Sequence, residues 1–276
     1  MGVSILLLTL NEEVNLPASL ESIKWSDDIV VFDSHSTDRT VEIANMAGTK
    51  VVERIFDNYA AQRNAALNEV EYKHPWVLMV DADERVTPEL RNEIEAVLSK
   101  EKSEITLYRI RRKDMFMGKW LRRSSGYPTW FGRLFKVGHV WIEREINEEY
   151  HTSGKIGYLQ SHFIHYPFNK GVAYWFERHN RYSSMEASSL IQELRVPLEL
   201  RKIFSSDPII RRRILKQLAY RMPGRPFLAF CYLYLFRLGI LDGRAGLTYC
   251  ILRSIYEYMI DIKVKELQRR EKGLPV

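Results

Sequence analysis

Residues 76–84 read Trp-Val-Leu-Met-Val-Asp-Ala-Asp-Glu, an apolar run that ends in two aspartates and a glutamate. A continuous apolar run of this length is typical of a strand buried on both faces, as in a parallel sheet. Carboxylates directly after such a strand are costly to bury without a counter-ion. We therefore expect Asp81 and Asp83 to have a functional role.

The residues on either side of this stretch alternate between strand and helix patterns. Thr87 and Pro88 provide a helix N-cap and a first helical residue. Strand–helix alternation with short connections predicts an α/β fold with a mainly parallel central sheet flanked by helices. The elements expected before residue 76 are strands at 3–8, 28–32 and 50–55, and helices at 12–23, at 59–70 and from the capping residues 36–38 to 46.

The rest of the chain differs in composition. Residues 104–166 are rich in aromatic and β-forming side chains, which predicts extra strands and loops against the sheet edge. Residues 174–193 and most residues after 196 have helical patterns. Residues 195–276 hold 17 lysines and arginines against 7 aspartates and glutamates, a net charge of +10, whereas the remainder holds 24 against 28, or −4. This change near residue 195 predicts a boundary.

Composition excludes several classes of protein. The 276 residues are 46% hydrophobic and 28% charged, which is globular usage and argues against disorder, collagen or a coiled coil. Cys231 and Cys250 cannot build a disulfide framework, so we expect buried free thiols in a reducing cytoplasm. The first residues lack signal-peptide features, and no stretch reaches the roughly 18 apolar residues that a membrane span needs.

Polar residues follow three of the four predicted strands. They are Thr9, Asn11 and Glu12 after the first, Asp33, Ser34, Ser36 and Asp38 after the second, and Asp81, Asp83 and Glu84 after the fourth. Parallel strands bring such residues to one edge, where carboxylates without cysteine suit Mg²⁺ or Mn²⁺. No glycine-rich phosphate loop is present, so Arg63 and Arg133 are candidates to hold phosphates. As alternatives, Ser36 and Asp38 fit helix caps better than ligands, and Thr9 and Asn11 fit turn residues.

Four motifs together resemble the nucleotide-sugar half of glycosyltransferase family 2. They are Leu-Leu-Thr-Leu-Asn-Glu-Glu at 7–13, Val-Val-Phe-Asp-Ser-His-Ser-Thr-Asp-Arg-Thr at 30–40, Tyr-Ala-Ala-Gln-Arg-Asn at 59–64 and Leu-Met-Val-Asp-Ala-Asp-Glu at 78–84. The resemblance is closest to the bacterial branch that includes lipopolysaccharide-core β-glucosyltransferases. Weaker matches follow at 133–135, 165–166 and 241–244.

The resemblance implies a GT-A fold and an inverting, metal-dependent transfer from a UDP-sugar, with glucose as the sugar. It implies that Thr9, Asn11 and Glu12 line the base pocket and that Asp33 holds the uracil or ribose. Asp81 would face the ribose and sugar, Asp83 would ligate the metal, and Ser36, Arg63 and Arg133 would also contact the donor. His165 matches a family histidine near the metal, although a lone histidine fits a core position equally well.

Inversion needs a base that takes the proton of the acceptor hydroxyl. In the resembled branch this base usually sits in a His-Glu pair after an Arg-Leu-Phe segment. The matching stretch here is Glu-Ile-Asn-Glu-Glu at 145–149, where Asn147 replaces the histidine. Glu148 is then the expected base, with Glu145 as the second choice and a solvated acidic surface as the alternative.

The expected organisation has three segments. Residues 1–100 form the nucleotide-sugar-binding half and 101–194 the acceptor half of one GT-A domain, and 195–276 form a basic helical extension. The apolar run Phe227–Phe236 beside basic helices suits an in-plane helix on an anionic membrane, at the inner face of the bacterial cytoplasmic membrane, next to a glycan or lipid-linked acceptor. The alternative is a homo-oligomer through these helices, or their packing on the catalytic domain.

The sequence gives weaker support to two other functions. An Asp-x-Asp motif after a strand also occurs in haloacid dehalogenase-type phosphotransferases, but there it lies on the first strand and ends in Thr or Val. The pI of about 9.2 raises the alternative of a nucleic-acid-binding protein. The basic segment lacks a zinc motif or an RNA-binding aromatic signature, so we expect no nucleic-acid partner.

Overall fold

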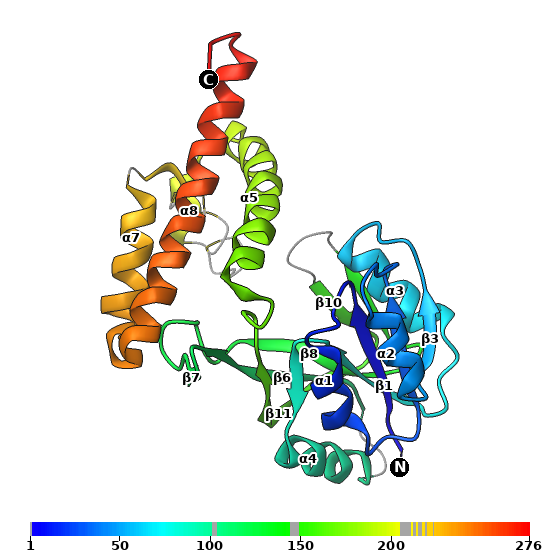
Figure 1. Cartoon of the computed structure of the whole chain (residues 1–276). Helices are drawn as coiled ribbons and strands as arrows, with labels where there is room; N and C mark the ends of the chain where they lie inside the picture. The colour runs from blue at the N-terminus through cyan, green and yellow to red at the C-terminus, as the bar shows by residue number, and fades with distance from the viewer. Residues whose placement is uncertain are drawn as a thin grey trace. The chain divides into compact units, whose positions relative to one another are not determined.

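The computed structural model describes residues 2–100, 104–143, 149–204 and 224–276, together with 211, 214, 217, 218 and 220–222. The chain divides into two compact units (Figure 1). The first comprises Met1–Met115 and Tyr127–Lys170, and the second comprises Phe116–Gly126 and Gly171–Val276. The charge boundary expected at residue 195 coincides with the end of a helix, whereas the compact units divide at residue 170.

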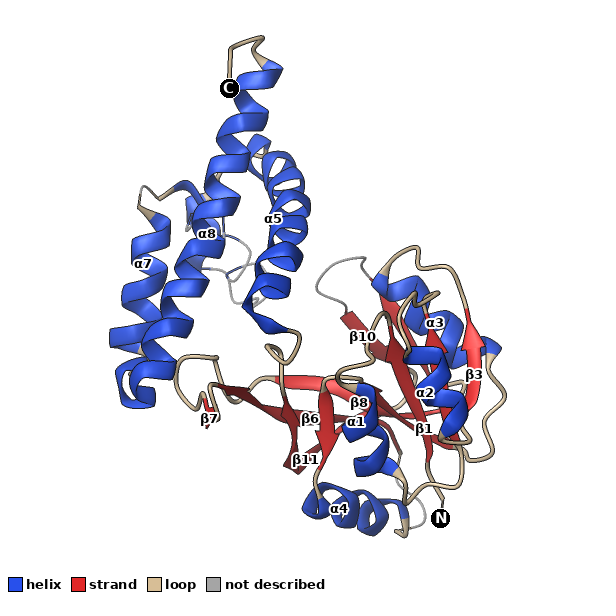
Figure 2. Cartoon of the chain, viewed as in Figure 1, coloured by secondary structure: helices blue, strands red, loops and turns tan. Residues whose placement is uncertain are grey.

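The first unit is a sheet with helices on its faces (Figure 2). Its elements are β1 (Ser4–Thr9), α1 (Leu16–Ile23), β2 (Ile29–Asp33), α2 (Thr40–Met46), β3 (Lys50–Glu53), α3 (Tyr59–Glu69), β4 (Trp76–Asp81), β5 (Glu84–Val86), α4 (Pro88–Leu98), β6 (Ile105–Phe116), β8 (Trp130–Lys136), β9 (Val140–Glu143), β10 (Glu149–Thr152) and β11 (Lys155–His165).

The sheet has the strand order β3-β2-β1-β4-β8-β6-β11-β5. β1 runs parallel to β2 and β4, as the alternating pattern predicts. β8 is antiparallel to both β4 and β6, and β11 is parallel to β6. The carboxyl ends of β1, β2, β4, β6 and β11 therefore point to the same edge of the sheet. β9 and β10 form a separate antiparallel pair.

Successive side chains of β1 point to opposite faces of the sheet, and each face carries a hydrophobic core. Ile5 and Leu7 belong to one hydrophobic cluster, which α1 completes, whereas Leu6 belongs to a second cluster with residues of α3. Each fully buried leucine or isoleucine stabilises the fold by about 1.5–3 kcal/mol relative to an exposed one. These two layers hold the ends of the strands, and thus the polar residues after them, in fixed positions.

Two helix starts illustrate how local sequence sets the elements. Thr87 caps α4 as predicted, since its side chain accepts a hydrogen bond from the backbone of Leu90 at 3.2 Å. α1 begins at Leu16 and not at the expected Glu12, because Pro17 has no backbone N–H to donate and is tolerated only in the first turn of a helix. The backbone N–H of Glu12 donates to the side chain of Thr40 at 2.7 Å. The residues after β1 are thus tied to the start of α2.

The second unit is helical. Its elements are β7 (Lys119–Trp120), α5 (Gly171–Arg195), η1 (Leu200–Phe204), α7 (Arg225–Cys231), η2 (Tyr232–Phe236), η3 (Gly239–Asp242) and α8 (Gly243–Glu271). α5 and α7 both pack against α8 (Figure 1). Cys250 is buried as expected, whereas Cys231, the last residue of α7, is partly exposed.

Asp242, in the weakly matched segment 241–244, has a structural role in this unit. Its Oδ2 atom accepts hydrogen bonds from the backbone of Arg123 at 2.9 Å and from the backbone and hydroxyl of Ser124, both at 2.8 Å. Among the described residues, no single helix combines the length and apolar character that a membrane crossing requires. The pair Arg225–Phe236 and Gly239–Glu271, bent by 72°, meets that criterion jointly, by length and composition alone.

Candidate active site

Thr9 and Asp33, which are buried, form a hydrogen-bonded group with half-buried Ser36 at the ends of β1 and β2. The hydroxyl of Thr9 donates to Oδ1 of Asp33 at 2.7 Å. The hydroxyl and the backbone N–H of Ser36 both donate to the Asp33 carboxylate at 2.6 Å. β1 and β2 pair in register at Thr9 and Asp33, which explains how residues 24 positions apart meet. Ser36 therefore orients Asp33 and does not cap α2.

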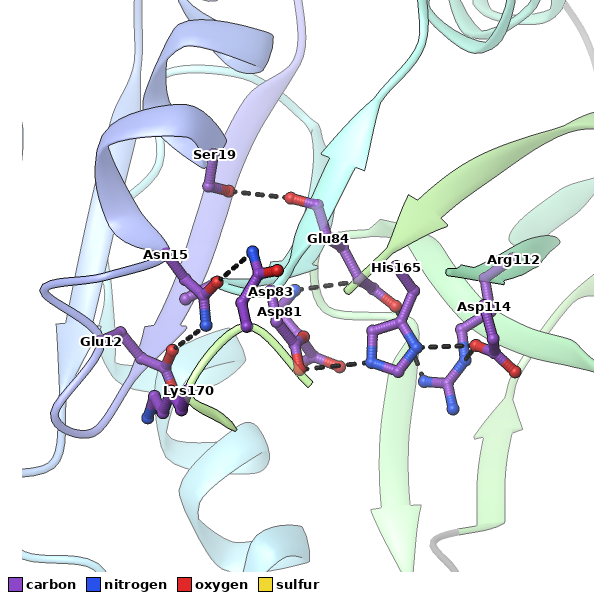
Figure 3. Close-up of polar contacts among 12 residues, drawn as sticks. Glu12, Asn15, Ser19, Asp81, Asp83, Glu84, Arg112, Asp114, His165 and Lys170 are labelled. Atoms are coloured by element: carbon purple, nitrogen blue, oxygen red, sulfur yellow. Dashed lines mark hydrogen bonds and ion pairs between the residues drawn. The ribbon is translucent and has the colours of Figure 1, made fainter. Parts of the chain in front are cut away.

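Asn11 and Glu12 follow β1, and their side chains contact different partners. Asn11 has a positive φ of 53°, and its side-chain oxygen accepts from the backbone of Thr37 at 2.7 Å. Asparagine tolerates this left-handed conformation better than most residues. Glu12 forms an ion pair with Lys170 at 2.5 Å (Figure 3). Burial raises the pKa of Glu12, although Lys170 opposes this shift.

A second group joins Asp81 and Glu84 through Arg133. Nη2 of Arg133 contacts Asp81 Oδ2 and lies 3.0 Å from Oε1 of Glu84. Arg63 approaches Asp81 at 3.4 Å. Burial would raise the pKa of Asp81, but Arg133 and Arg63 outweigh it, so the pKa is lowered and Asp81 is ionised. Removing Arg133 would leave buried Glu84 with the more distant Arg112, 3.8 Å away, as its cationic partner, and would destabilise this group.

A third group centres on His165, at the end of β11. Its Nδ1 atom lies 2.7 Å from Oδ1 of Asp114, and its Nε2 atom lies 3.2 Å from Oδ2 of Asp83 (Figure 3). Arg112 contacts the same Asp114 oxygen at 3.2 Å. Burial and Arg112 lower the pKa of His165, yet the two carboxylates raise it to about 9. The imidazole is therefore protonated at neutral pH and serves as the counter-ion of Asp83.

Asp83 and His165 fit the ligand chemistry of a divalent cation. Histidine binds a metal as the neutral imidazole, so a cation here would displace the Nε2 proton of His165 while Asp114 keeps its hydrogen bond at Nδ1. Mn²⁺ accepts carboxylate and imidazole ligands. Within the described ranges, no three His, Cys, Asp or Glu side chains are arranged to hold a metal by themselves. A cation here would complete its coordination with water and ligand phosphates, as Mg²⁺ commonly does.

The structure brings most of the expected residues together at the carboxyl edge of the sheet. Asp114 and Lys170 were missed, because each contributes through a partner from a distant element. A polar residue near the end of a predicted strand is the signal that would have found Asp114. Glu145 and Glu148 lie outside the described residues. They fall between β9 and β10, which pair at Glu143 and Glu149.

Comparisons with known proteins identify the family of the chain. The family model "Glycosyl transferase family 2" matches residues 4–154. An uncharacterised glycosyltransferase of Rickettsia typhi is 30% identical over 203 residues, covering 69% of this chain and 68% of the relative. The lipopolysaccharide core biosynthesis glycosyltransferase LpsC of Rhizobium meliloti is 25% identical over 216 residues, covering 74% of this chain and 77% of LpsC.

A solved structure shows the same fold. The mannosyltransferase PcManGT from Pyrobaculum calidifontis, in complex with GDP-Man and Mn²⁺, aligns with a TM-score of 0.51 at 15% identity and covers 95% of this chain and 86% of its own. The expected GT-A fold is thereby confirmed, and the family match displaces the phosphotransferase alternative. The chain belongs to glycosyltransferase family 2.

Proposed function

We propose that this glycosyltransferase moves a hexose such as glucose, with inversion, from a UDP-sugar to a glycan or lipid-linked acceptor in the synthesis of bacterial lipopolysaccharide or another cell-envelope polysaccharide. The similarity to LpsC, a lipopolysaccharide core biosynthesis glycosyltransferase, supports the choice of pathway. The Thr9–Asp33–Ser36 group supports a nucleoside pocket, with Asp33 accepting hydrogen bonds from the base or ribose and Asn11 beside it.

The observation that carries the proposal is the contact between Asp83 and His165 at the edge where β1, β2 and β4 end. Asp83 and His165 would hold a divalent cation, Mn²⁺ or Mg²⁺. The structure of the mannosyltransferase PcManGT, which contains Mn²⁺ together with a nucleotide sugar, supports this assignment. When bound, such a cation stabilises the charge of the departing diphosphate.

The protein's own residues would supply the other parts of the reaction. Asp81, ionised and held by Arg133 and Arg63, would orient the ribose and the sugar. Glu148 would accept the proton of the acceptor hydroxyl as its oxygen bonds to the anomeric carbon and the bond from that carbon to the diphosphate breaks. Attack from the side opposite the leaving group inverts the anomeric centre. Glu145 is the second candidate for the base.

Hydrolysis of a panel of nucleotide sugars tests the proposal. The purified chain would be incubated with UDP-glucose, UDP-galactose, GDP-mannose or CMP-sialic acid, with Mn²⁺ or with EDTA. We expect slow release of UDP from a UDP-hexose only when Mn²⁺ is present. Turnover of GDP-mannose alone would replace the UDP-sugar with a GDP-sugar, and no turnover of any donor would contradict the proposal.

The helical unit supports a second part of the proposal, attachment to an anionic membrane surface where a lipid-linked acceptor lies. Large apolar side chains of α7, η2 and η3 are exposed, most of all Phe236 at 86%, Phe227 at 69% and Leu241 at 64%. Arg237 and Arg244 flank η3 in the sequence. Apolar side chains beside basic ones suit insertion into the interface of an anionic bilayer.

A further inference from the structure

Five side chains share one face of the sheet where β8, β6 and β11 run next to one another. Arg109 pairs with Gly132 of β8 and Tyr158 of β11, and Arg111 pairs with Trp130 of β8 and His162 of β11. Residues paired across strands project to the same face. We call the surface formed by Arg109, Arg111, Trp130, Tyr158 and His162 the Trp130 face.

Aromatic rings form the apolar part of the Trp130 face. Trp130 and Tyr158 meet edge to face, with ring centroids 5.1 Å apart, and the Tyr158 residue is 51% exposed. The guanidinium carbon of Arg111 lies 4.9 Å from the Trp130 ring centroid and 5.7 Å from that of Tyr127. Aromatic rings that are partly or fully exposed next to a few polar groups can cover the apolar face of a sugar ring.

The Trp130 face is also strongly positive. Arg109, Arg111 and Lys113 alternate along β6 and so project to the same side. The side chain of Arg109 has no hydrogen bond or ion pair with another described residue. Burial lowers the pKa of His162, and Lys113 and Arg111 lower it further, which is what a positive potential does to an imidazole. Guanidinium groups in such a setting match carboxylate and phosphate oxygens.

The position of the Trp130 face relates it to the reaction. A Cβ atom added to Gly132 would lie 3.0 Å from the Tyr150 ring, so Tyr150 of β10 lies directly over Gly132, two residues from Trp130 along β8. β10 begins at Glu149, directly after the segment that carries Glu145 and Glu148. A ligand on the Trp130 face would therefore lie beside β10, the strand that directly follows the proposed base in the sequence. The Thr9–Asp33–Ser36 group, which is proposed to bind the nucleoside, lies elsewhere, at the ends of β1 and β2.

We propose that the Trp130 face binds the acceptor and that this acceptor is a saccharide carrying a carboxylate or a phosphate. Trp130 and Tyr158 contact its ring, and Arg109 and Arg111 pair with its anionic group. This inference rests on the proposed function, because it names the substrate class of the same site. Arg111 also donates to the backbone oxygen of Gln160 in the irregular part of β11, so Arg109 and Tyr158 are the better positions for substitution.

Ligand-detected NMR with three small probes tests this inference. The full chain would be titrated with glucuronic acid, glucose 6-phosphate and glucose. We expect the anionic probes to bind about tenfold or more tightly than glucose, because an ion-paired hydrogen bond is lost with the neutral sugar. Binding of only one anionic probe would support the proposal and identify the group as carboxylate or phosphate. Equal binding of all three probes would overturn it.

Variants then assign the binding to the Trp130 face. Arg109→Gln should weaken the anionic probes about tenfold, and Tyr158→Ala should weaken all probes. Lys24→Gln, which removes one charge from an exposed side chain of the same unit, is the matched control and should change nothing. Equal effects of Arg109→Gln and Lys24→Gln would overturn the proposal.

UDP affinity, measured on the same variants, distinguishes a failure of the proposed acceptor site from a failure of the proposed function. Unchanged UDP affinity in Arg109→Gln is expected, and a loss would mean that the positive charge serves the donor. If UDP does not bind even the unmodified chain, the proposed function fails, whereas altered probe binding with normal UDP binding concerns the acceptor alone. Should Arg109→Gln not fold, as judged by circular dichroism, Tyr158→Ala provides the decisive comparison.

Discussion

His165 and Asp114 occupy paired positions on the parallel strands β11 and β6, and their side chains meet at 2.7 Å between Nδ1 and Oδ1. This contact fixes the imidazole so that its Nε2 atom faces Asp83. A carboxylate behind a metal-binding histidine commonly sets the orientation of the ring and its basicity. Asp114 is therefore expected to act through His165.

Replacing Asp114 with asparagine tests this role. The variant keeps the size of the side chain but removes its charge, so the imidazole is held less firmly. We expect the Mn²⁺ concentration for half-maximal UDP-sugar turnover to rise about 10–100-fold, the usual effect of losing such a partner. Asp27→Asn, which alters an exposed carboxylate of the same unit, is the control. Unchanged Mn²⁺ dependence in Asp114→Asn would remove Asp114 from the site.

The base is tested by a pair of amide substitutions. Glu148→Gln retains the shape of the side chain and loses the ability to accept a proton. Transfer to an acceptor should fall about 10²–10⁴-fold while UDP affinity stays the same. Glu145→Gln is the matched comparison, and it should keep most of the activity. The opposite result would assign the base to Glu145, and full activity of both variants would place it elsewhere.

Acidification should destabilise the helical unit through His179. Its ring stacks on Trp175 at 3.7 Å between centroids, and burial lowers its pKa from 6.5 to about 4. The unfolded chain therefore takes up a proton at higher pH than the folded chain. The stability that depends on neutral His179 is fully present above pH 6.5 and is lost as the pH falls toward 4.

Thermal unfolding at two pH values measures this effect. Because His179 is only half-buried, we expect about 1 kcal/mol, or a few degrees in Tm, between about pH 7 and about pH 4.5. His179→Phe keeps the ring contacts and cannot titrate, so its Tm should fall less over this interval. An equal fall in both proteins would mean that other groups cause the acid sensitivity.

Membrane attachment is tested with vesicles of anionic lipid. The intact chain should bind at low salt and retain a bound fraction at about 0.5 M salt, where charge attraction is screened. The double variant Phe236→Ser and Leu241→Ser should lose that remainder. Met46→Ser, at a position 78% exposed on the first unit, should not. If the intact chain does not bind at low salt, a soluble acceptor becomes the better interpretation.

The sequence was sufficient to predict most elements before residue 100, but not β5. Continuous apolar runs, the Thr87-Pro88 start signal and short connections are local features, so β1, β4 and α4 follow from them directly. The central place of β8 between β4 and β6 could not be predicted in the same way. It depends on antiparallel pairing between residues such as Leu78 and Leu134, which lie far apart in the chain and carry no local signal.

In the candidate site, too, local sequence patterns predicted some residues, whereas others depend on contacts between distant parts of the chain. Asp33 and Asp83 come at or after the ends of apolar strands, and that local pattern is what makes them candidates. Lys170 neutralises Glu12 from a distance of 158 residues, and His165 meets Asp114 only because β11 and β6 pair in register. Ser36 was favoured as a helix cap because its residue type suits a cap, whereas the fold places Asp33 within reach of its hydroxyl.

The affinity of the intact chain for UDP, measured by calorimetry with Mn²⁺ and with EDTA, tests the central claim most directly. A cation held by Asp83 and His165 would join the diphosphate to the protein, so UDP should bind about tenfold or more tightly with Mn²⁺. Asp83→Asn should bind UDP equally in both conditions. Equal UDP affinity of the unmodified chain with Mn²⁺ and with EDTA would contradict the claim.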